Sequence, residues 1–475
     1  MLLMVRREAW SATLVAVDRE PCVSIIPSGF FARGVVFVLT RPLQLFVGTE
    51  ARGALLLLVA TGAALVWANS PWVASYEALW STSLSVQVGE AELVKDLRHW
   101  VNDGLMTLFF FVVGLELSRQ LKLGELRDWR AMTVPAVAAL GGMVAPALLY
   151  LAFNPSGAAA RGWAIAIAGD LALVVGVLAL VGSRCPPQLR VLLLTLVIVN
   201  NLAAVAVVGL LYAEVVNILA LAVVVELFAV LAVLRLLRVL RTFAYLVVGV
   251  ALWVATSASG IHPAIVGLLL GVVLTAYPPV PAEVLRATRL GRWFEPDPTP
   301  AMLWEAPLGA DKTVPPILRL QQLLHPWSSY LVVPIFALAN AGITLDRDLL
   351  ARAVGSPITL GVLAGLVVGK LVGIVGASLL ALRVGLGPLP RMVTRQQLAA
   401  AAALAGIGFT VALFVTDLAF TDRVAENEAK VGILVASAAA ATLGWLLFHL
   451  PIRGPGRRPR AGVDPSAGGA GGADG

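Results

Sequence analysis

Long apolar runs and short polar connections alternate along most of the chain. The runs have the length of about 17–25 residues that a helix needs to cross the hydrocarbon core of a bilayer. Because they are continuous, they favour membrane helices over the alternating strands of a β-barrel. We expect twelve membrane-spanning helices near residues 52–69, 101–121, 131–152, 162–182, 189–212, 217–240, 243–257, 261–277, 327–343, 358–382, 397–419 and 430–450.

The connection between the first two spans has a different pattern. The stretch "SLSVQVGEAELV" (83–94) alternates apolar and polar residues around a Gly-Glu turn. Such alternation predicts a small β-hairpin outside the cytoplasm. The predicted fold class is therefore an all-α polytopic membrane protein with one small extracytoplasmic hairpin.

Composition and charge agree with this class and set the orientation. The chain is 59% hydrophobic and 13% charged, whereas soluble domains carry about 25% charged residues. The net charge of +7 comes from arginines and lysines in short loops that follow the even-numbered spans. By the positive-inside rule, these loops and both termini are cytoplasmic, and a nucleic-acid partner is not expected. The two cysteines, Cys22 and Cys185, give no disulfide framework and no metal-binding spacing.

The chain divides into three parts by composition. Residues 1–50 are an N-terminal extension expected in the cytoplasm, and residues 51–453 hold the apolar spans. The Gly/Pro-rich tail, residues 454–475, is expected to be disordered and cytoplasmic.

Two charged residues lie in the middle of apolar spans. Asp170 is in "GWAIAIAGDLALVVGVLAL" and Lys370 is in "LGVLAGLVVGKLVGIVGASLL". A charge at the bilayer centre costs about 2.5–3.5 kcal/mol on insertion scales, so such residues usually have a function. For Lys370 the alternative is a head group that extends to the membrane interface.

Glycines indicate that two of the spans are interrupted. Gly169 directly precedes Asp170, and "LAGIGFTVALF" (404–414) contains Gly406, Gly408 and Thr410. A broken helix exposes helix ends within the membrane, and these ends need opposite charges or water. The carboxylate of Asp170 suits positive N-terminal ends, and the ammonium of Lys370 suits negative C-terminal ends. The fourth and eleventh spans occupy matching places in an early and a late helix triple, as inverted repeats would place them.

Five segments resemble the bacterial sodium/proton antiporter NhaA family, from about residue 50 to residue 453 and in matching order. They are "HWVNDGLMTLFFFVVGLELSRQL", "PAVAALGGMVAPALLYLAFN", "RGWAIAIAGDLALVVGVLALVGSRCP", "LHPWSSYLVVPIFALANAGI" and "GIGFTVALFV". The resemblance implies twelve helices with the fourth and eleventh interrupted, and exchange of Na⁺ or Li⁺ for protons. It further implies a bacterial inner-membrane protein that is no enzyme, needs no cofactor, serves pH and sodium homeostasis and dimerises through the hairpin 83–94.

The resemblance also implies roles for individual residues. Asp170 matches the family's aspartate near the broken fourth helix, and Lys370 matches its lysine on the tenth helix. His262, in "SGIHPAIVG", matches a histidine linked to the pH response, although a lone histidine near a span end can also be a simple structural donor. Glu116, in "FFFVVGLELSRQL", is either a carboxylate at the mouth of the cytoplasmic funnel or a solvated residue at a span end.

The chain departs from the family at its most important positions. Asn200 and Asn201, in "VIVNNLAAV", stand where the family has paired aspartates on the fifth helix, and Gly169 stands where a threonine is typical. An amide can offer an oxygen to sodium but cannot carry a proton. A sodium site made of Asp170, Asn200 and Asn201 would therefore have to couple to protons through Asp170, Lys370 or both.

Three interpretations of function follow. The first is a monovalent cation/proton antiporter with altered site residues. The second is a transport-deficient or differently coupled paralogue with a binding or regulatory role, in which Asp170 and Lys370 only neutralise helix ends. The third is an intramembrane aspartyl protease using Asp170 and Asp417. It fails because a GxGD motif would need glycine at Ile167, and because a catalytic dyad needs two close, deep carboxylates.

Overall fold

The computed structural model describes residues 51–88, 91–123, 129–211, 217–237, 242–273, 316–386 and 393–450 of the 475-residue chain. The expected N-terminal extension and the expected disordered tail lie outside these residues.

The described residues are mostly helical, and many of the helices could cross a membrane. Six are long and apolar enough to do so: Ala51–Ala68, Leu97–Arg119, Thr133–Phe153, Pro187–Val207, Pro357–Arg383 and Arg423–His449. Two helix pairs are together apolar and long enough as well but are bent at a short break, Gly157–Ile167 with Leu171–Val181 at 44° and Arg395–Leu404 with Phe409–Ala419 at 46°. Each of the twelve predicted ranges overlaps a helix, and the two bent pairs coincide with the predicted interruptions. The predicted class, a polytopic helical membrane protein, is confirmed.

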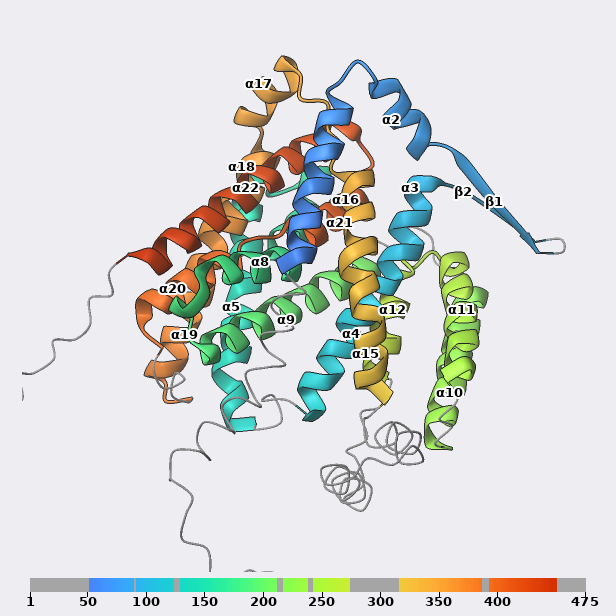
Figure 1. The fold of residues 1–475 in the computed structure, drawn as a ribbon, viewed down its shortest axis with the longest axis horizontal. Coiled ribbons are helices and arrows are strands. Elements are labelled where there is room, and N and C mark those ends of the chain that lie inside the picture. Colours follow the sequence, from blue (N-terminus) through green and yellow to red (C-terminus); the bar gives the residue numbers. More distant parts are fainter. Residues whose placement is uncertain are drawn as a thin grey trace, which may run out of the picture. The chain divides into compact units, whose positions relative to one another are not determined.

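Further elements follow the first helix, and Figure 1 labels most of them. They are α2 (Val73–Trp80), β1 (Ser83–Val88), β2 (Ala91–Asp96), α3 (Leu97–His99), η1 (Trp100–Leu105), α4 (Met106–Leu123), α5 (Trp129–Phe153), α6 (Gly157–Ala160), α7 (Trp163–Ile167), α8 (Leu171–Val181), η3 (Gly182–Arg184), α9 (Pro187–Leu211), α10 (Ile218–Leu236), α11 (Thr242–Ser259), α12 (Ala264–Val273), α15 (Pro316–Trp327), η4 (Ser328–Val332), α16 (Val333–Asn340), α17 (Arg347–Gly355), α18 (Pro357–Leu363), η5 (Ala364–Gly369), α19 (Lys370–Arg383), α20 (Arg395–Leu404), α21 (Phe409–Ala419) and α22 (Arg423–His449).

The alternating stretch 83–94 lies within two paired strands. β1 and β2 are antiparallel, with Ser83 opposite Asp96 and Val88 opposite Ala91. The ribbon extends away from the helices (Figure 1). Among the described residues its sheet has two strands, so each strand has an edge without a strand partner there, which another chain could cover.

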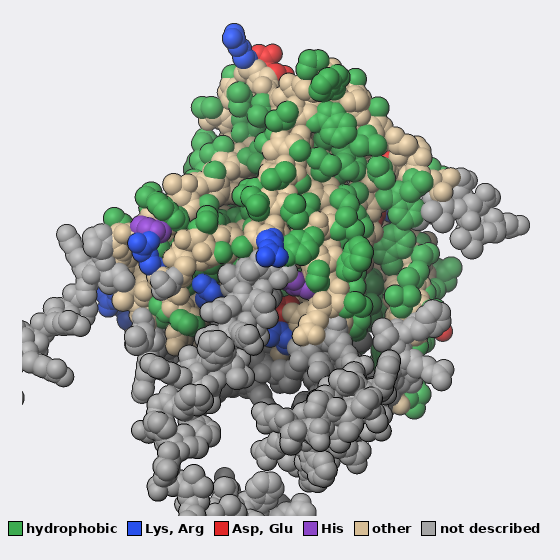
Figure 2. Space-filling model, in the orientation of Figure 1, with side chains coloured by type: hydrophobic (Ala, Val, Ile, Leu, Met, Phe, Trp, Pro, Cys, Tyr) green, Lys and Arg blue, Asp and Glu red, His purple; other side chains and the backbone are tan. Residues whose placement is uncertain are grey.

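The outer surface of the helices is largely apolar. Figure 2 shows hydrophobic side chains over most of the visible face of the described part. Large side chains such as Leu55, Val66 and Leu180 are more than half exposed. An apolar surface of this extent suits contact with lipid rather than water.

Close packing against α5 fixes the position of α19, the helix that carries Lys370. A Cβ added at Gly373 of α19 would lie 2.1 Å from the carbonyl oxygen of Gly141 on α5. The backbones of α5 and α19 therefore approach too closely for any larger residue at this point. Directly before Lys370, η5 is a π-helical turn, a feature that occurs frequently at functional sites.

Candidate functional site

Asp170 joins the two broken spans. It precedes α8, is 1% exposed, and its Oδ1 accepts a hydrogen bond of 3.0 Å from the backbone N–H of Leu173. Its Oδ2 accepts one of 2.8 Å from the backbone N–H of Thr410, in the first turn of α21. The backbone N–H of Asp170 donates to the carbonyl of Ile407 at 2.7 Å, within the second break. One buried carboxylate thus meets the positive N-terminal ends of two different half-helices.

Lys370 lies at a helix end of the opposite polarity. Its side chain is fully buried, and Nζ donates a hydrogen bond of 2.7 Å to the carbonyl oxygen of Ile167. Ile167 is the last residue of α7, so the ammonium faces a negative C-terminal end. An extension of this head group to the membrane interface is excluded by its burial. No ion pair joins Lys370 to Asp170 within the described residues, so each charge is held by backbone groups.

Asn200 and Asn201 place two buried amides beside the first break. Their side chains are 0% and 1% exposed. The Oδ1 of Asn201 accepts a hydrogen bond of 2.9 Å from the backbone N–H of Gly169. Among the described residues, neither polar atom of Asn200 nor the Nδ2 of Asn201 has a hydrogen-bond partner. Each unsatisfied buried polar group costs about 1–3 kcal/mol, so three together indicate a place for water or an ion.

Glycines let the two breaks approach each other. A Cβ at Gly408 would lie 3.3 Å from the carbonyl oxygen of Ala168, and one at Gly406 would lie 2.3 Å from that of Leu366. A Cβ at Gly169 would lie 3.2 Å from Val197 and 3.5 Å from the Oδ1 of Asn201. The absence of a side chain at these positions keeps the broken segments, α9 and η5 in close contact.

Glu116 and His262 lie on or beside elements other than the two broken helix pairs. Glu116 on α4 is 7% exposed and accepts hydrogen bonds from Arg119 and from Gln321 of α15, so it is buried rather than solvated. His262 lies before α12, and its Nδ1 accepts a hydrogen bond of 3.2 Å from the N–H of Ala264. Its Nε2 therefore carries the proton in the neutral ring. That nitrogen is 3.1 Å from Oδ1 of Asp103.

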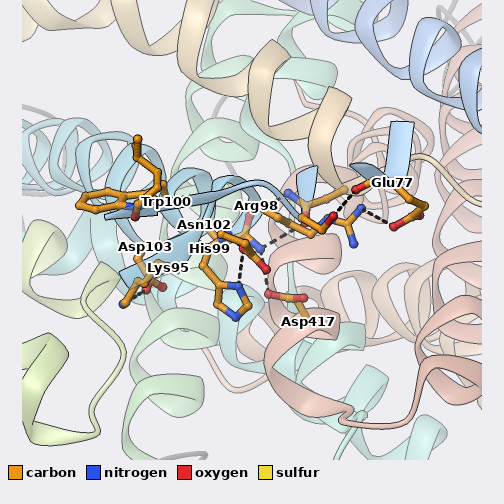
Figure 3. A network of polar contacts seen from close by, with 12 residues as sticks. Glu77, Lys95, Arg98, His99, Trp100, Asn102, Asp103 and Asp417 are labelled. Atoms are coloured by element: carbon orange, nitrogen blue, oxygen red, sulfur yellow. Dashed lines mark hydrogen bonds and ion pairs between the residues drawn. The ribbon is translucent and has the colours of Figure 1, made fainter. Parts of the chain in front are cut away.

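Sequence reasoning missed a polar network around η1, which Figure 3 shows. Asp103 is 8% exposed and pairs with Lys95 and His262. The neighbouring Asn102 points the other way, toward Asp417 of α21 (Figure 3), and its Nδ2 is 2.8 Å from the Oδ2 of Asp417. The sequence signal that could have indicated this network is the adjacent amide and acid, Asn102 and Asp103 in "WVNDG", at the end of an apolar span.

A polytopic membrane protein with two broken helices that meet at a buried acid and a buried base has the architecture of a secondary transporter. The family model described as "Na+/H+ antiporter 1" matches residues 44–448. The chain belongs to this family.

Individual relatives agree with this assignment. The chain is 46% identical over 405 residues to Na(+)/H(+) antiporter NhaA 3 of Frankia alni, covering 85% of this chain and 88% of that protein. It is 44% identical over 431 residues to NhaA 1 of Salinispora arenicola, covering 90% of this chain and 66% of the relative. It is 41% identical over 402 residues to NhaA 1 of Mycobacterium sp. strain KMS, covering 85% and 66%. The chain thus spans about two thirds of the length of the latter two relatives, and the resemblance to the NhaA family is confirmed.

Proposed function

We propose that this protein exchanges a monovalent cation, Na⁺ or Li⁺, for protons across the bacterial inner membrane and contributes to pH and sodium homeostasis. Membership of the antiporter family supports this activity. The observation that carries it is the contact of one buried carboxylate, Asp170, with both broken helices. Lys370 of α19, whose Nζ contacts the end of α7 at the first break, and the unsatisfied amides on α9 complete the proposed site.

The transported cation would be held by oxygen atoms. Hard cations prefer carboxylate and amide oxygens, and Asp170, Asn200 and Asn201 offer both kinds. The Oδ1 of Asn200 has no other partner among the described residues, whereas that of Asn201 already accepts from Gly169. We therefore assign Asn200 as the amide ligand and Asn201 chiefly as the group that holds the break in place.

Coupling to protons would rest on the two ionisable residues. Since amides carry no proton at neutral pH, only Asp170 and Lys370 can exchange one at this place. A cation bound to Asp170 competes with a proton for the same carboxylate. The cation also repels the Lys370 ammonium, and this repulsion is stronger in the buried site than in water. Either effect makes occupancy by cation and proton mutually exclusive. His262 and Glu116, which lie on other elements, would adjust the pH dependence without binding the cation.

The finer architecture is part of the same proposal. We infer twelve membrane spans with both termini in the cytoplasm, supported by the arginines that follow the even-numbered spans. The hairpin β1–β2 would lie outside the cytoplasm, where its unpaired edges support a role in a homodimer.

A second candidate is a paralogue that keeps the fold but does not exchange ions, and has a binding or regulatory role instead. The amides at Asn200 and Asn201 favour it, because the family's paired aspartates are its ion-binding and proton-carrying groups. In this case Asp170 and Lys370 only neutralise the half-helix ends.

Everted membrane vesicles with a fluorescent pH indicator distinguish the two candidates. An antiporter gives dequenching when NaCl or LiCl is added, whereas choline chloride gives none. The absence of a response between near-neutral and mildly alkaline pH, with the protein folded and inserted, would favour the paralogue.

Restoring both carboxylates tests whether the scaffold is intact. If Asn200→Asp with Asn201→Asp raises or creates the sodium response, the surrounding parts still support transport. The matched control is Asn217→Asp, which makes the same chemical change at the exposed start of α10, where either side chain can accept from Leu219.

A further inference from the structure

Three residues far apart in the sequence form one polar cluster beside α21. Asn102 of η1 and Asn340 at the end of α16 exchange hydrogen bonds of 2.7 and 3.2 Å between their amides, and the two side chains are 3% and 2% exposed. Asn102 also donates to Asp417, the one acidic residue of α21. Figure 3 shows Asn102 directed at this carboxylate.

The charge of Asp417 is not balanced by its neighbours. Its side chain is partly buried, and its recorded partner is a neutral amide. No Lys, Arg or His forms an ion pair with Asp417 in the part of the chain that the structure describes. Of the basic residues in the same network, Lys95 pairs with Asp103 and Arg98 pairs with Glu77. A partly buried carboxylate without a counter-charge attracts a cation.

The position of Asp417 connects it to the central site. The first turn of α21 contacts Asp170, because the N–H of Thr410 donates to the Asp170 carboxylate. Asp417 is seven residues further on, which is about 10 Å along the axis and nearly the same helical face. Phe414 lies between them and packs against Phe110 and His262, with ring centroids 5.2 and 4.9 Å apart. Aromatic rings thus separate the Asp170 site from Asp417 along α21.

We propose that Asp417, with the amide oxygens of Asn102 and Asn340, is a second binding site for the transported cation. This inference rests on the proposed antiport. The carboxylate supplies the negative charge, and the two amides supply oxygen ligands once their mutual hydrogen bonds open. The cation moves between this Asp417 site and Asp170 along α21, past Phe414. A chain with neutral amides on α9 thereby has a second acid on the ion path.

Transport kinetics in proteoliposomes of known protein orientation test the Asp417 site. Asp417→Asn keeps the size and the acceptor for Asn102 but removes the charge. We expect the half-saturating sodium concentration to rise about tenfold when sodium is applied on the side of the β1–β2 hairpin, corresponding to about 1.4 kcal/mol. From the opposite side it should stay within about twofold, because the cation then meets Asp170 first.

Two further variants serve as controls for this measurement. Asp417→Glu should restore most of the sodium affinity, since it keeps the carboxylate. Asp348→Asn removes a charge from the exposed first turn of α17 and should behave as wild type. An unchanged half-saturating concentration in Asp417→Asn, or an equal rise on both sides, would overturn the proposal.

A binding measurement separates this proposal from the proposed function. If the wild-type protein exchanges no ions, the proposed antiport function is wrong, but a bound sodium ion would still raise the Tm of the purified protein above its Tm in choline. Asp417→Asn should then lose part of the sodium-dependent rise in Tm, and Asp348→Asn should keep it. A full wild-type rise in Asp417→Asn, or no rise in wild type, would exclude a cation at Asp417.

Discussion

Replacing Asp170 by alanine should destabilise the protein more than the loss of an ordinary helix cap does. The carboxylate accepts one backbone N–H from α8 and one from α21, and the residue is 1% exposed. Asp170→Ala leaves both donors buried without a partner. At about 1–3 kcal/mol for each donor, the free energy of unfolding should fall by about 2–6 kcal/mol.

A graded series separates the two hydrogen bonds. Asp170→Asn keeps one acceptor oxygen and turns an NH₂ group toward the other donor, so we expect about half the loss, roughly 1–3 kcal/mol. The control is Asp346→Ala. Asp346 caps α17 through the N–H of Leu349 at 2.7 Å and is exposed, so its removal should cost about 0.5–2 kcal/mol.

Reversible unfolding in mixed detergent micelles, followed by tryptophan fluorescence, gives these free energies. The order predicted is Asp170→Ala, then Asp170→Asn, then Asp346→Ala, from the largest loss to the smallest. If Asp170→Ala lowers the free energy of unfolding no more than Asp346→Ala does, the carboxylate does not hold the two broken helices together.

Three further predictions address packing, a buried thiol and a buried hydroxyl. Gly373→Ala should lower the free energy of unfolding by about 1–3 kcal/mol, because its Cβ would meet a carbonyl of α5 at 2.1 Å. Gly376→Ala, on the same helix with nothing within 4 Å, should be neutral or stabilise by up to about 1 kcal/mol; equal losses in micelle unfolding would contradict this. Burial raises the pKa of Cys185, between α8 and α9, to about 11, so in Cys22→Ser protein maleimide labelling should be slow at pH 7 and rise about tenfold per pH unit up to pH 9. Fast labelling at neutral pH would show that the thiol is exposed. Tyr76→Phe removes a hydroxyl within 2.9 Å of the Leu338 carbonyl and should cost about 0.5–1.5 kcal/mol in the same unfolding assay, whereas no loss would mean that water replaces the bond.

The spans and their interruptions could be predicted because they depend on local sequence. Hydropathy reports the apolar runs directly, and glycines beside an in-span charge mark the breaks. The matching of charge to helix end also follows from the macrodipole. Asp170 at two N-terminal ends and Lys370 at a C-terminal end agree with that expectation.

Contacts between distant segments could not be predicted from one sequence. Asn102 is separated by 238 residues from Asn340 and by 315 from Asp417. Nothing local in either partner indicates the other. The contact of Glu116 with Gln321, which buries a residue expected at a span end, spans 205 residues. Such pairings are set by how the helices pack, which hydropathy does not report.

Similarly, the sequence showed both amides of α9 as equivalent substitutions, but the structure distinguishes them. Asn201 accepts from the backbone of Gly169, while Asn200 has no partner among the described residues. The difference arises from the approach of the first break to α9, which depends on tertiary packing. It predicts that single restorations differ, with Asn200→Asp changing sodium response more than Asn201→Asp in the vesicle assay.

We propose that the buried acid at the two breaks, Asp170, binds the exchanged cation. The most direct test is uptake of radioactive ²²Na⁺ by liposomes that contain only the purified protein, driven by an imposed pH gradient. Liposomes with the wild-type protein should accumulate sodium and lose it when the pH gradient is dissipated. Liposomes with the same amount of folded Asp170→Asn protein should take up no more sodium than protein-free liposomes. Uptake by Asp170→Asn equal to wild type would show that this carboxylate does not bind the exchanged cation, and wild-type uptake no greater than that of protein-free liposomes would show that the protein does not exchange sodium.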